Sequence, residues 1–180
     1  LALILVGALL LSAPFSHYEQ GWGDPVLSIF TATSAVTVTG LIIVDTATYW
    51  TSGGQVIILL LMFVGGLGFM TLAAFLLAVL GQRVSMAQRM LIRETLGSEN
   101  MGGIQRLSVT IVAAAIAIQI IGFLALFARF LFLESPGEAA WQALFHSVSG
   151  FNNAGFVILN YSDGLHAFRE DFVVLSIIGW

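Results

Sequence analysis

Two short segments of this sequence combine small, hydroxyl-bearing and amide side chains with a glycine near the end. The first reads FTATSAVTVTGL (residues 30–41) and the second reads FHSVSGFNNAGF (residues 145–156). The loop that closes each segment has no carboxylate and no imidazole, so the ligands for an ion must come mainly from backbone carbonyls. Carbonyl oxygens replace the hydration shell of a weakly hydrated alkali cation, whereas Mg²⁺ requires carboxylates and retained waters. The candidate cation ligands are Thr37, Val38, Thr39, Gly40, Asn152, Asn153, Ala154 and Gly155.

The two segments belong to a repeated unit. A shift of 115 residues, from 30 to 145, superposes them, and the chain around them repeats in the order span, short capped helix, polar loop ending in glycine, span. Two matched units imply a shared axis between them, with a site built from both loops. The aligned pairs include Phe30 with Phe145, Ser34 with Ser149, and Gly40 with Gly155.

The composition is that of an integral membrane protein. Of the 180 residues, 58% are hydrophobic and 9% are charged, and the mean hydropathy is +0.98. These values lie far from the average of soluble proteins. The absence of cysteine excludes disulfides and thiolate metal sites, and the net charge of −4 argues against a nucleic-acid partner.

Two apolar segments, residues 55–80 and 107–132, are predicted to cross the bilayer. At 1.5 Å per residue each reaches about 39 Å, which exceeds the hydrocarbon thickness of about 30 Å. Residues 1–13 resemble the end of another span and residues 172–180 the start of one. We favour this interpretation of residues 1–13 over a signal peptide because no basic segment precedes them. The chain is therefore expected to be a fragment of a longer, all-α membrane protein.

Arginine distribution predicts the orientation. Four of the six basic residues lie in or beside the connection formed by residues 82–106, whereas the other connections carry mostly acids. By the positive-inside rule this connection is cytoplasmic, and the segments 14–54 and 133–171 face outward from the plasma membrane. The first half of the connection is amphipathic, which suits either anionic lipid or a docked regulatory subunit, and the Gly102-Gly103 pair is predicted to break its helix.

Each outward segment opens with a helix start. Asp24 precedes Pro25, and Ser135 precedes Pro136 in a predicted capping box with Glu138. The apolar helices that follow are about 14 and 20 Å long, too short to span the bilayer. They are typical of re-entrant hairpins, whose C-terminal dipole ends point toward the membrane centre and favour a cation there.

The sequence therefore predicts two repeats joined by a cytoplasmic connection. In the second repeat the short helix is expected to be about one turn longer, because ten residues rather than six separate its cap from the aligned phenylalanine. The first repeat is residues 1–81, with a pore helix at 25–33, a filter loop at 34–41 and a span at 55–80. The second is residues 107–180, with a span at 107–132, a pore helix at 136–148, a filter loop at 149–156 and the start of a final span at 172–180.

Three features allow more than one interpretation. Gly65, Gly66 and Gly68 favour close helix packing over a hinge. His146 and Ser149 have the spacing of a serine hydrolase pair, but a hydrogen bond beside the loop is the preferred role for the histidine because no acid lies nearby in sequence. The loops themselves would also suit simple packing elements whose threonines bond back to helix carbonyls.

The motifs SAVTVTGL (residues 34–41), SGFNNAGF (149–156) and GGLGF (65–69) resemble the Trk/Ktr/HKT superfamily of potassium transporters, most closely its Ktr-type membrane subunits. The resemblance implies that four such units surround one pore and that Gly40 and Gly155 are filter glycines. It implies potassium as the transported ion, sodium as a coupling ion in symport as an open alternative, and no cofactor or enzymatic activity. It also implies a homodimer and a cytoplasmic nucleotide-binding regulatory subunit.

Only two of the four expected units are present, so the remaining repeats of the polypeptide must complete the pore. The gating elements of that family have no counterpart in these residues. The function predicted is potassium transport through a carbonyl-lined filter. The leading alternative is a non-conducting membrane subunit that anchors a larger complex, and an intramembrane hydrolase is a distant third.

Overall fold

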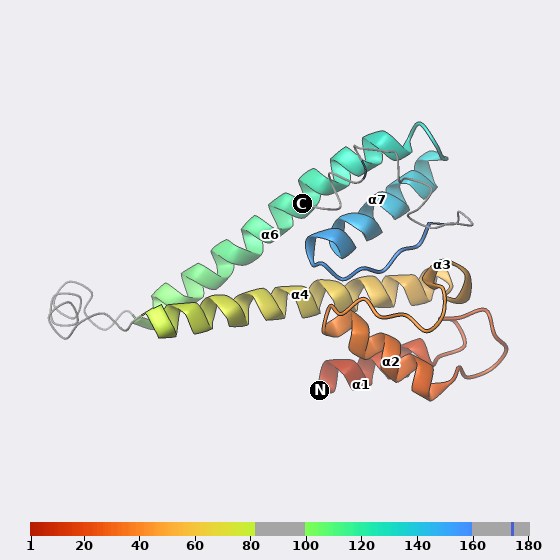
Figure 1. Cartoon of the computed structure of the whole chain (residues 1–180), viewed down its shortest axis with the longest axis horizontal. Coiled ribbons are helices and arrows are strands. Elements are labelled where there is room, and N and C mark those ends of the chain that lie inside the picture. The colour runs from red at the N-terminus through yellow and green to blue at the C-terminus, as the bar shows by residue number, and fades with distance from the viewer. Residues whose placement is uncertain (82–99, 160–173, 175–180) are drawn as a thin grey trace, which may run out of the picture. The chain divides into compact units, whose positions relative to one another are not determined.

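The computed structural model of the chain describes residues 1–81, 100–159 and 174, and the regular elements in these ranges are helices. The chain consists of two compact units, Leu1–Gly66 with Ile118–Trp180, and Leu67–Ala117. The first unit contains both candidate loops. The helices are α1 (Ala2–Leu11), α2 (Pro25–Val36), α3 (Thr46–Tyr49), α4 (Ser52–Gly81), α6 (Asn100–Phe130) and α7 (Pro136–Phe151) (Figure 1).

Within the described ranges, two helices are long and apolar enough to cross a membrane. Their qualifying segments are Ser52–Leu72 in α4 and Val109–Phe130 in α6, of 21 and 22 residues. The helix break predicted at the Gly102-Gly103 pair was wrong, because α6 begins at Asn100 and runs through both glycines. A glycine inside a helix costs only about 1 kcal/mol, which continuous hydrogen bonding into a long apolar helix offsets. The amphipathic part of the predicted connection and the start of the final span lie outside the described residues, except Val174, which is helical and buried.

The short helices α2 and α7 begin at the predicted prolines. The Asp24 side chain accepts a 2.8 Å hydrogen bond from the Val26 N–H, as an N-cap should. The capping box predicted for α7 was wrong, because the Ser135 hydroxyl donates to the Glu138 carboxylate at 2.9 Å instead of accepting a backbone N–H.

Both short helices extend three residues beyond the predicted ends, to Val36 and Phe151. Residues 34–36 and 149–151 are therefore helix and not loop. No proline or left-handed residue interrupts these stretches, so the intrahelical hydrogen bonds continue until the backbone changes hand. The helices have 12 and 16 residues, a difference of about one turn.

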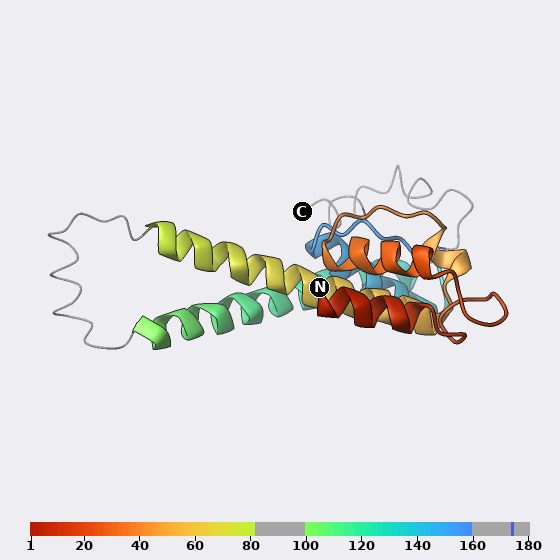
Figure 2. The ribbon, with the colours of Figure 1, turned by 90° about the horizontal axis from the view of Figure 1, so that it is seen from below.

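One hydrophobic core serves both repeats. It joins Ala8 and Leu11 of α1 to residues of α2, to Ile58 and Met62 of α4, and to Phe145 of α7. Helix α1 packs along α2 (Figure 2). Because a single core holds both short helices, the loops at their ends are placed relative to each other by the same packing.

The outward segment before α2 is attached to the start of α4. His17 and Trp50 form an isolated antiparallel bridge, and the Thr51 N–H donates to the Ser16 carbonyl at 3.0 Å. The Thr51 hydroxyl donates to the Phe15 carbonyl at 2.5 Å. These contacts hold the end of α1 beside the start of α4, and no sequence pattern predicted them.

Helix α4 lies between α2 and α7 (Figure 1), and two consecutive glycines allow its close approach. A Cβ at Gly65 would overlap the carbonyl oxygen of Val36 at the end of α2. A Cβ at Gly66 would overlap the side-chain oxygen of Asn152, just after α7. These two glycines therefore allow close helix packing, as the sequence analysis predicted. Gly65 lies against the first repeat and Gly66 against the second.

We expect Gly65→Ala to lower the stability of the full-length protein. The added methyl group would meet a backbone oxygen, which cannot yield without moving the end of α2. Overpacking of this kind typically costs about 1–3 kcal/mol. Thermal unfolding of the purified protein in detergent measures the loss as a lower Tm.

Gly122→Ala is the matched control. Gly122 also lies inside a long helix, but a Cβ there would sit 3.7 Å from the Cβ of Ser147, an ordinary contact. Alanine should also gain up to about 1 kcal/mol of helix propensity at that position. Equal Tm values for the two variants would contradict the close packing of Gly65.

Candidate cation-binding site

The first candidate loop turns its amides back toward the helix that precedes it. The N–H of Thr37 donates to the Thr33 carbonyl at 2.9 Å, and the N–H of Thr39 donates to the Ser34 carbonyl at 3.0 Å. Between them the N–H of Val38 donates to Ala35 at 3.3 Å. The loop amides are thus satisfied by the last turn of α2.

The second loop repeats this pattern bond for bond. Its amides donate from Asn152 to Val148 at 3.1 Å, from Asn153 to Gly150 at 2.9 Å, and from Ala154 to Ser149 at 2.8 Å. Each donor and each acceptor lies 115 residues after its counterpart in the first loop. The two loops therefore share one hydrogen-bonding scheme.

The backbone angles of the loops also agree. The φ angle is 52° at Val38 and 55° at Asn153, and it is 69° at Gly40 and 73° at Gly155. Glycine adopts such angles without strain, and asparagine tolerates them. A β-branched residue does not, so Val38 is a strained position. Val38 aligns with Asn153, and asparagine is a residue type that often adopts left-handed angles. This alignment could have predicted the left-handed backbone at Val38, but the sequence analysis did not use it.

The loop carbonyls have no donor among the described residues. Within the described part of the chain, none of the carbonyl oxygens of residues 37–40 or 152–155 accepts a hydrogen bond. A buried carbonyl without a partner is costly, and the cost rises in a membrane. These oxygens are therefore free to face water or a cation.

The structure brings the two loops together. A Cβ at Gly40 would overlap the carbonyl oxygen of Ala154 and lie 3.3 Å from the Cα of Gly155. A Cβ at Gly155 would lie 3.5 Å from the Cα of Gly40. Two glycines far apart in the sequence are thus in contact within one compact unit, and a side chain would overlap its neighbours at Gly40 but not at Gly155.

The polar side chains of the loops mostly hold the loops in place. The Thr37 hydroxyl donates to the Thr33 carbonyl at 2.7 Å, and the Thr39 hydroxyl donates to the Ser34 hydroxyl at 3.2 Å. The Asn152 amide nitrogen donates to the Val148 carbonyl at 2.9 Å. Threonine bonding back to the helix, as foreseen for packing loops, therefore occurs and leaves the backbone carbonyls as the available ligands.

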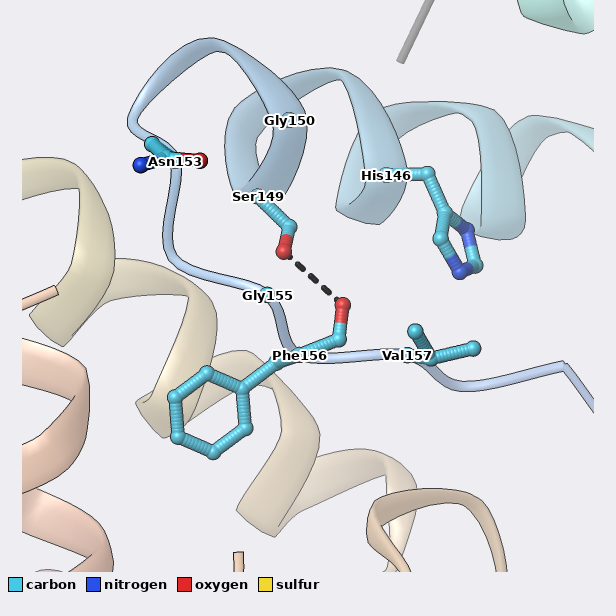
Figure 3. A pocket seen from close by; sticks show the side chains of 7 residues that line it. All are labelled: His146, Ser149, Gly150, Asn153, Gly155, Phe156 and Val157. Atoms are coloured by element: carbon cyan, nitrogen blue, oxygen red, sulfur yellow. Dashed lines mark hydrogen bonds between the residues drawn. The ribbon is translucent and has the colours of Figure 1, made fainter. Parts of the chain in front are cut away.

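A cavity of about 80 Å³ lies beside the second loop (Figure 3). The Ser149 hydroxyl, on its wall, donates to the Phe156 carbonyl at 2.8 Å. The His146 ring contacts the Gln142 carbonyl through Nδ1 at 2.8 Å, and its Nε2 accepts from the Ile158 N–H at 3.4 Å. Because the serine and the histidine are bonded elsewhere, they do not form a nucleophile–base pair. The cavity is lined by His146, Ser149, Gly150, Asn153, Gly155, Phe156 and Val157.

A resident metal site is not evident in the part of the chain that the structure describes. No group of three or more His, Asp or Glu side chains there is arranged to hold a metal ion. Any cation held at the loops would thus be coordinated by neutral oxygens, and a bound ion would exchange easily.

The TrkH family of cation transport proteins matches residues 15–180. The chain is 42% identical over 180 residues to the Ktr system potassium uptake protein B of Vibrio alginolyticus, covering 97% of this chain and 37% of that protein. It is 38% identical over 176 residues to the protein of the same name from Bacillus subtilis, covering 97% of this chain and 38% of that protein.

A further relative is the potassium/sodium uptake protein NtpJ of Enterococcus hirae, 37% identical over 176 residues, or 98% of this chain and 39% of that protein. The chain thus spans less than two fifths of the length of these relatives. They are transporters and not enzymes. By a match over most of its length, this chain belongs to the TrkH family of cation transport proteins.

Proposed function

We propose that this chain supplies two quadrants of the selectivity filter of a potassium uptake transporter of the KtrB type. The observation that carries the proposal is the pair of matched loops, which meet at Gly40 and Gly155 and whose carbonyl oxygens accept no hydrogen bond from the described part of the chain. The relatives named for potassium or potassium/sodium uptake support the choice of ion.

The helices that precede the loops favour a cation. Helices α2 and α7 end at Val36 and Phe151, immediately before the candidate ligands, and neither has a basic residue in its last turn. The C-terminal end of a helix carries a partial negative charge. Both helix ends therefore lower the energy of a cation held at residues 37–40 and 152–155.

The mechanism we propose involves no covalent chemistry. A potassium ion sheds its hydration water, is coordinated by loop carbonyls, and moves on in single file. The absence of carboxylates in the loops keeps the binding weak enough for release. The left-handed backbone at two positions of each loop allows successive carbonyls to be directed toward a common path.

The complete transporter requires more than this chain. We propose that further repeats of the polypeptide close the pore, that the protein works as a homodimer, and that it binds a cytoplasmic nucleotide-binding subunit. The name "Ktr system" of the relatives is consistent with several components. We also propose that the loops enter the membrane from outside and that residues 82–106 face the cytoplasm. For the mode of transport, symport with sodium as the coupling ion is the alternative to uptake of potassium alone.

The rival function is a non-conducting subunit that anchors a larger complex. The threonine hydroxyls that bond back to α2 are the observation in its favour, because packing loops would use them in the same way. Growth of a potassium-transport-deficient host at low potassium, carrying the full-length gene, separates the two. Growth rescue supports transport, and no rescue despite normal membrane insertion supports the rival.

We expect Gly40→Ser and Gly155→Ser to lower the potassium-over-sodium uptake ratio of the full-length transporter. Both glycines have positive φ angles, which L side chains disfavour by about 1–2 kcal/mol. Gly40→Ser should have the larger effect, because its Cβ would overlap the Ala154 carbonyl oxygen, whereas the Cβ at Gly155 makes an ordinary contact. Isotope uptake of both ions measures the ratio.

Gly21→Ser is the matched control for backbone strain. Gly21 has a φ of 90° in the outward segment, with no heavy atom within 4 Å of an added Cβ. It should tolerate serine sterically and keep the ion ratio while sharing the positive-φ penalty. Ion ratios that stay at the wild-type value in both filter variants would refute the proposed filter.

We expect Val38→Asn to stabilise the transporter and to preserve its ion selectivity. The substitution relieves a β-branched residue at φ 52°, a gain of about 1 kcal/mol, and copies the aligned Asn153. The reciprocal Asn153→Val should lower Tm. Selectivity should survive Val38→Asn because the proposed ligands are backbone oxygens. A collapse of the ion ratio in that variant would instead assign recognition to the side chain.

A further inference from the structure

The second loop and the segment that follows it are attached to α7 at three points, the last two of them through side chains of α7. The Ala154 N–H donates to the Ser149 carbonyl at 2.8 Å, and the Ser149 hydroxyl donates to the Phe156 carbonyl at 2.8 Å. Two residues later the Ile158 N–H donates to His146 Nε2 at 3.4 Å. The bonded residues lie on both sides of Gly155 in the sequence, so these bonds restrict the position of the Gly155 carbonyl.

The ring of His146 is held in one orientation. Its side chain is 2% exposed, and it makes edge contacts with the rings of Phe130 and Phe145 at centroid distances of 6.3 and 5.9 Å. Nδ1 lies 2.8 Å from the Gln142 carbonyl, which can only accept a hydrogen bond. The proton of a neutral imidazole therefore sits on Nδ1, and Nε2 is left as the acceptor for the Ile158 N–H.

Packing alone does not hold this segment against α7. The cavity of about 80 Å³ lies between the helix and residues 155–157 (Figure 3). The Phe156 ring is buried and points away from α7 (Figure 3). Beside the apolar contacts of Ile158 and Leu159 with α7, the segment is therefore held by two directional hydrogen bonds, one donated by Ser149 and one accepted by His146.

Among the described residues, the first repeat lacks the two attachments that α7 makes through side chains. Thr31 occupies the position equivalent to His146, and among the described residues no side chain of α2 bonds to residues 41–43. The Ser34 hydroxyl accepts from Thr39 instead of donating to the segment. Correspondingly Leu41 and Ile43 are 61% and 58% exposed, whereas the equivalent Phe156 and Ile158 are 1% and 4% exposed.

We propose that His146 is a positioning residue for ion selection, acting through the Ile158 N–H to hold the segment after the second loop and so the carbonyl of Gly155. The inference rests on the proposed filter and goes beyond it, because it makes the two quadrants unequal. The second is fixed from within its own repeat by an imidazole. The first is not fixed in this way by the described residues.

The test uses His146→Phe and His146→Gln in the full-length transporter. Phenylalanine keeps an aromatic ring beside Phe130 and Phe145 but removes the acceptor, whereas glutamine retains an acceptor oxygen. We expect His146→Phe to lower the potassium-over-sodium uptake ratio roughly three- to tenfold, the scale of one lost hydrogen bond. His146→Gln should restore much of the ratio, and Thr31→Val, at the equivalent site, should leave it unchanged.

A second variant removes the donor and leaves every side chain in place. Incorporating the α-hydroxy acid analogue of isoleucine at Ile158 replaces its N–H by an ester oxygen, so His146 Nε2 loses its partner. The ion ratio should fall as in His146→Phe. A wild-type ratio in the ester protein, or in His146→Phe at normal membrane abundance, overturns the proposal; a purely structural role would change abundance alone.

Hydrogen exchange separates failure of this inference from failure of the filter. In His146→Phe, amides in a peptide covering residues 154–159 should exchange at least severalfold faster, while those of residues 39–43 stay unchanged. Faster exchange, with Gly40→Ser and Gly155→Ser both at the wild-type ion ratio, would reject the filter and keep the hydrogen bond. If exchange is unchanged in His146→Phe while Gly40→Ser and Gly155→Ser lower the ion ratio, only the role of His146 is rejected.

Discussion

The constraint on which the rest depends is that every backbone polar group at membrane depth needs a partner. In residues 37–39 and 152–154 the amides meet this demand by donating to the preceding helix. The carbonyls then have no donor in the ranges that the structure describes, and the backbone is left-handed at Val38 and Asn153. A loop built in this way presents neutral oxygens, which are suitable ligands for an alkali cation and unsuitable for Mg²⁺.

The scaffold places two such loops against each other. Gly65 lets α4 approach the end of α2, and Gly66 lets it approach Asn152 after α7. Consecutive residues of one helix thus support the loops of both repeats. The shared core, with Met62 buried completely, adds a common foundation. The contact between Gly40 and Gly155 follows from this arrangement, and it requires glycine at position 40, where a Cβ would overlap the Ala154 carbonyl oxygen.

The two repeats agree in their loops and differ in how the loops are held. The first contains strain at Val38, where the second has an asparagine suited to the same angle. The second is tied to its helix through Ser149 and His146, where the first has no such bonds to residues 41–43 among the described residues. Internal repetition has therefore preserved the hydrogen bonds that direct the carbonyls, while the surrounding supports have diverged.

The sequence by itself determined the membrane class, the two apolar spans, the proline-started short helices and the one-turn difference between them, because each depends on local composition and spacing. It misjudged where α2 and α7 end and wrongly placed a helix break at Gly102-Gly103, since a helix continues as long as its hydrogen bonds do, even through glycines. Only the tertiary structure decided that Gly40 meets Gly155, that Gly66 faces Asn152, and that His146 receives the Ile158 N–H. Those contacts join residues that are far apart in the sequence or that lie on opposite sides of a loop, and packing in the shared core sets their geometry.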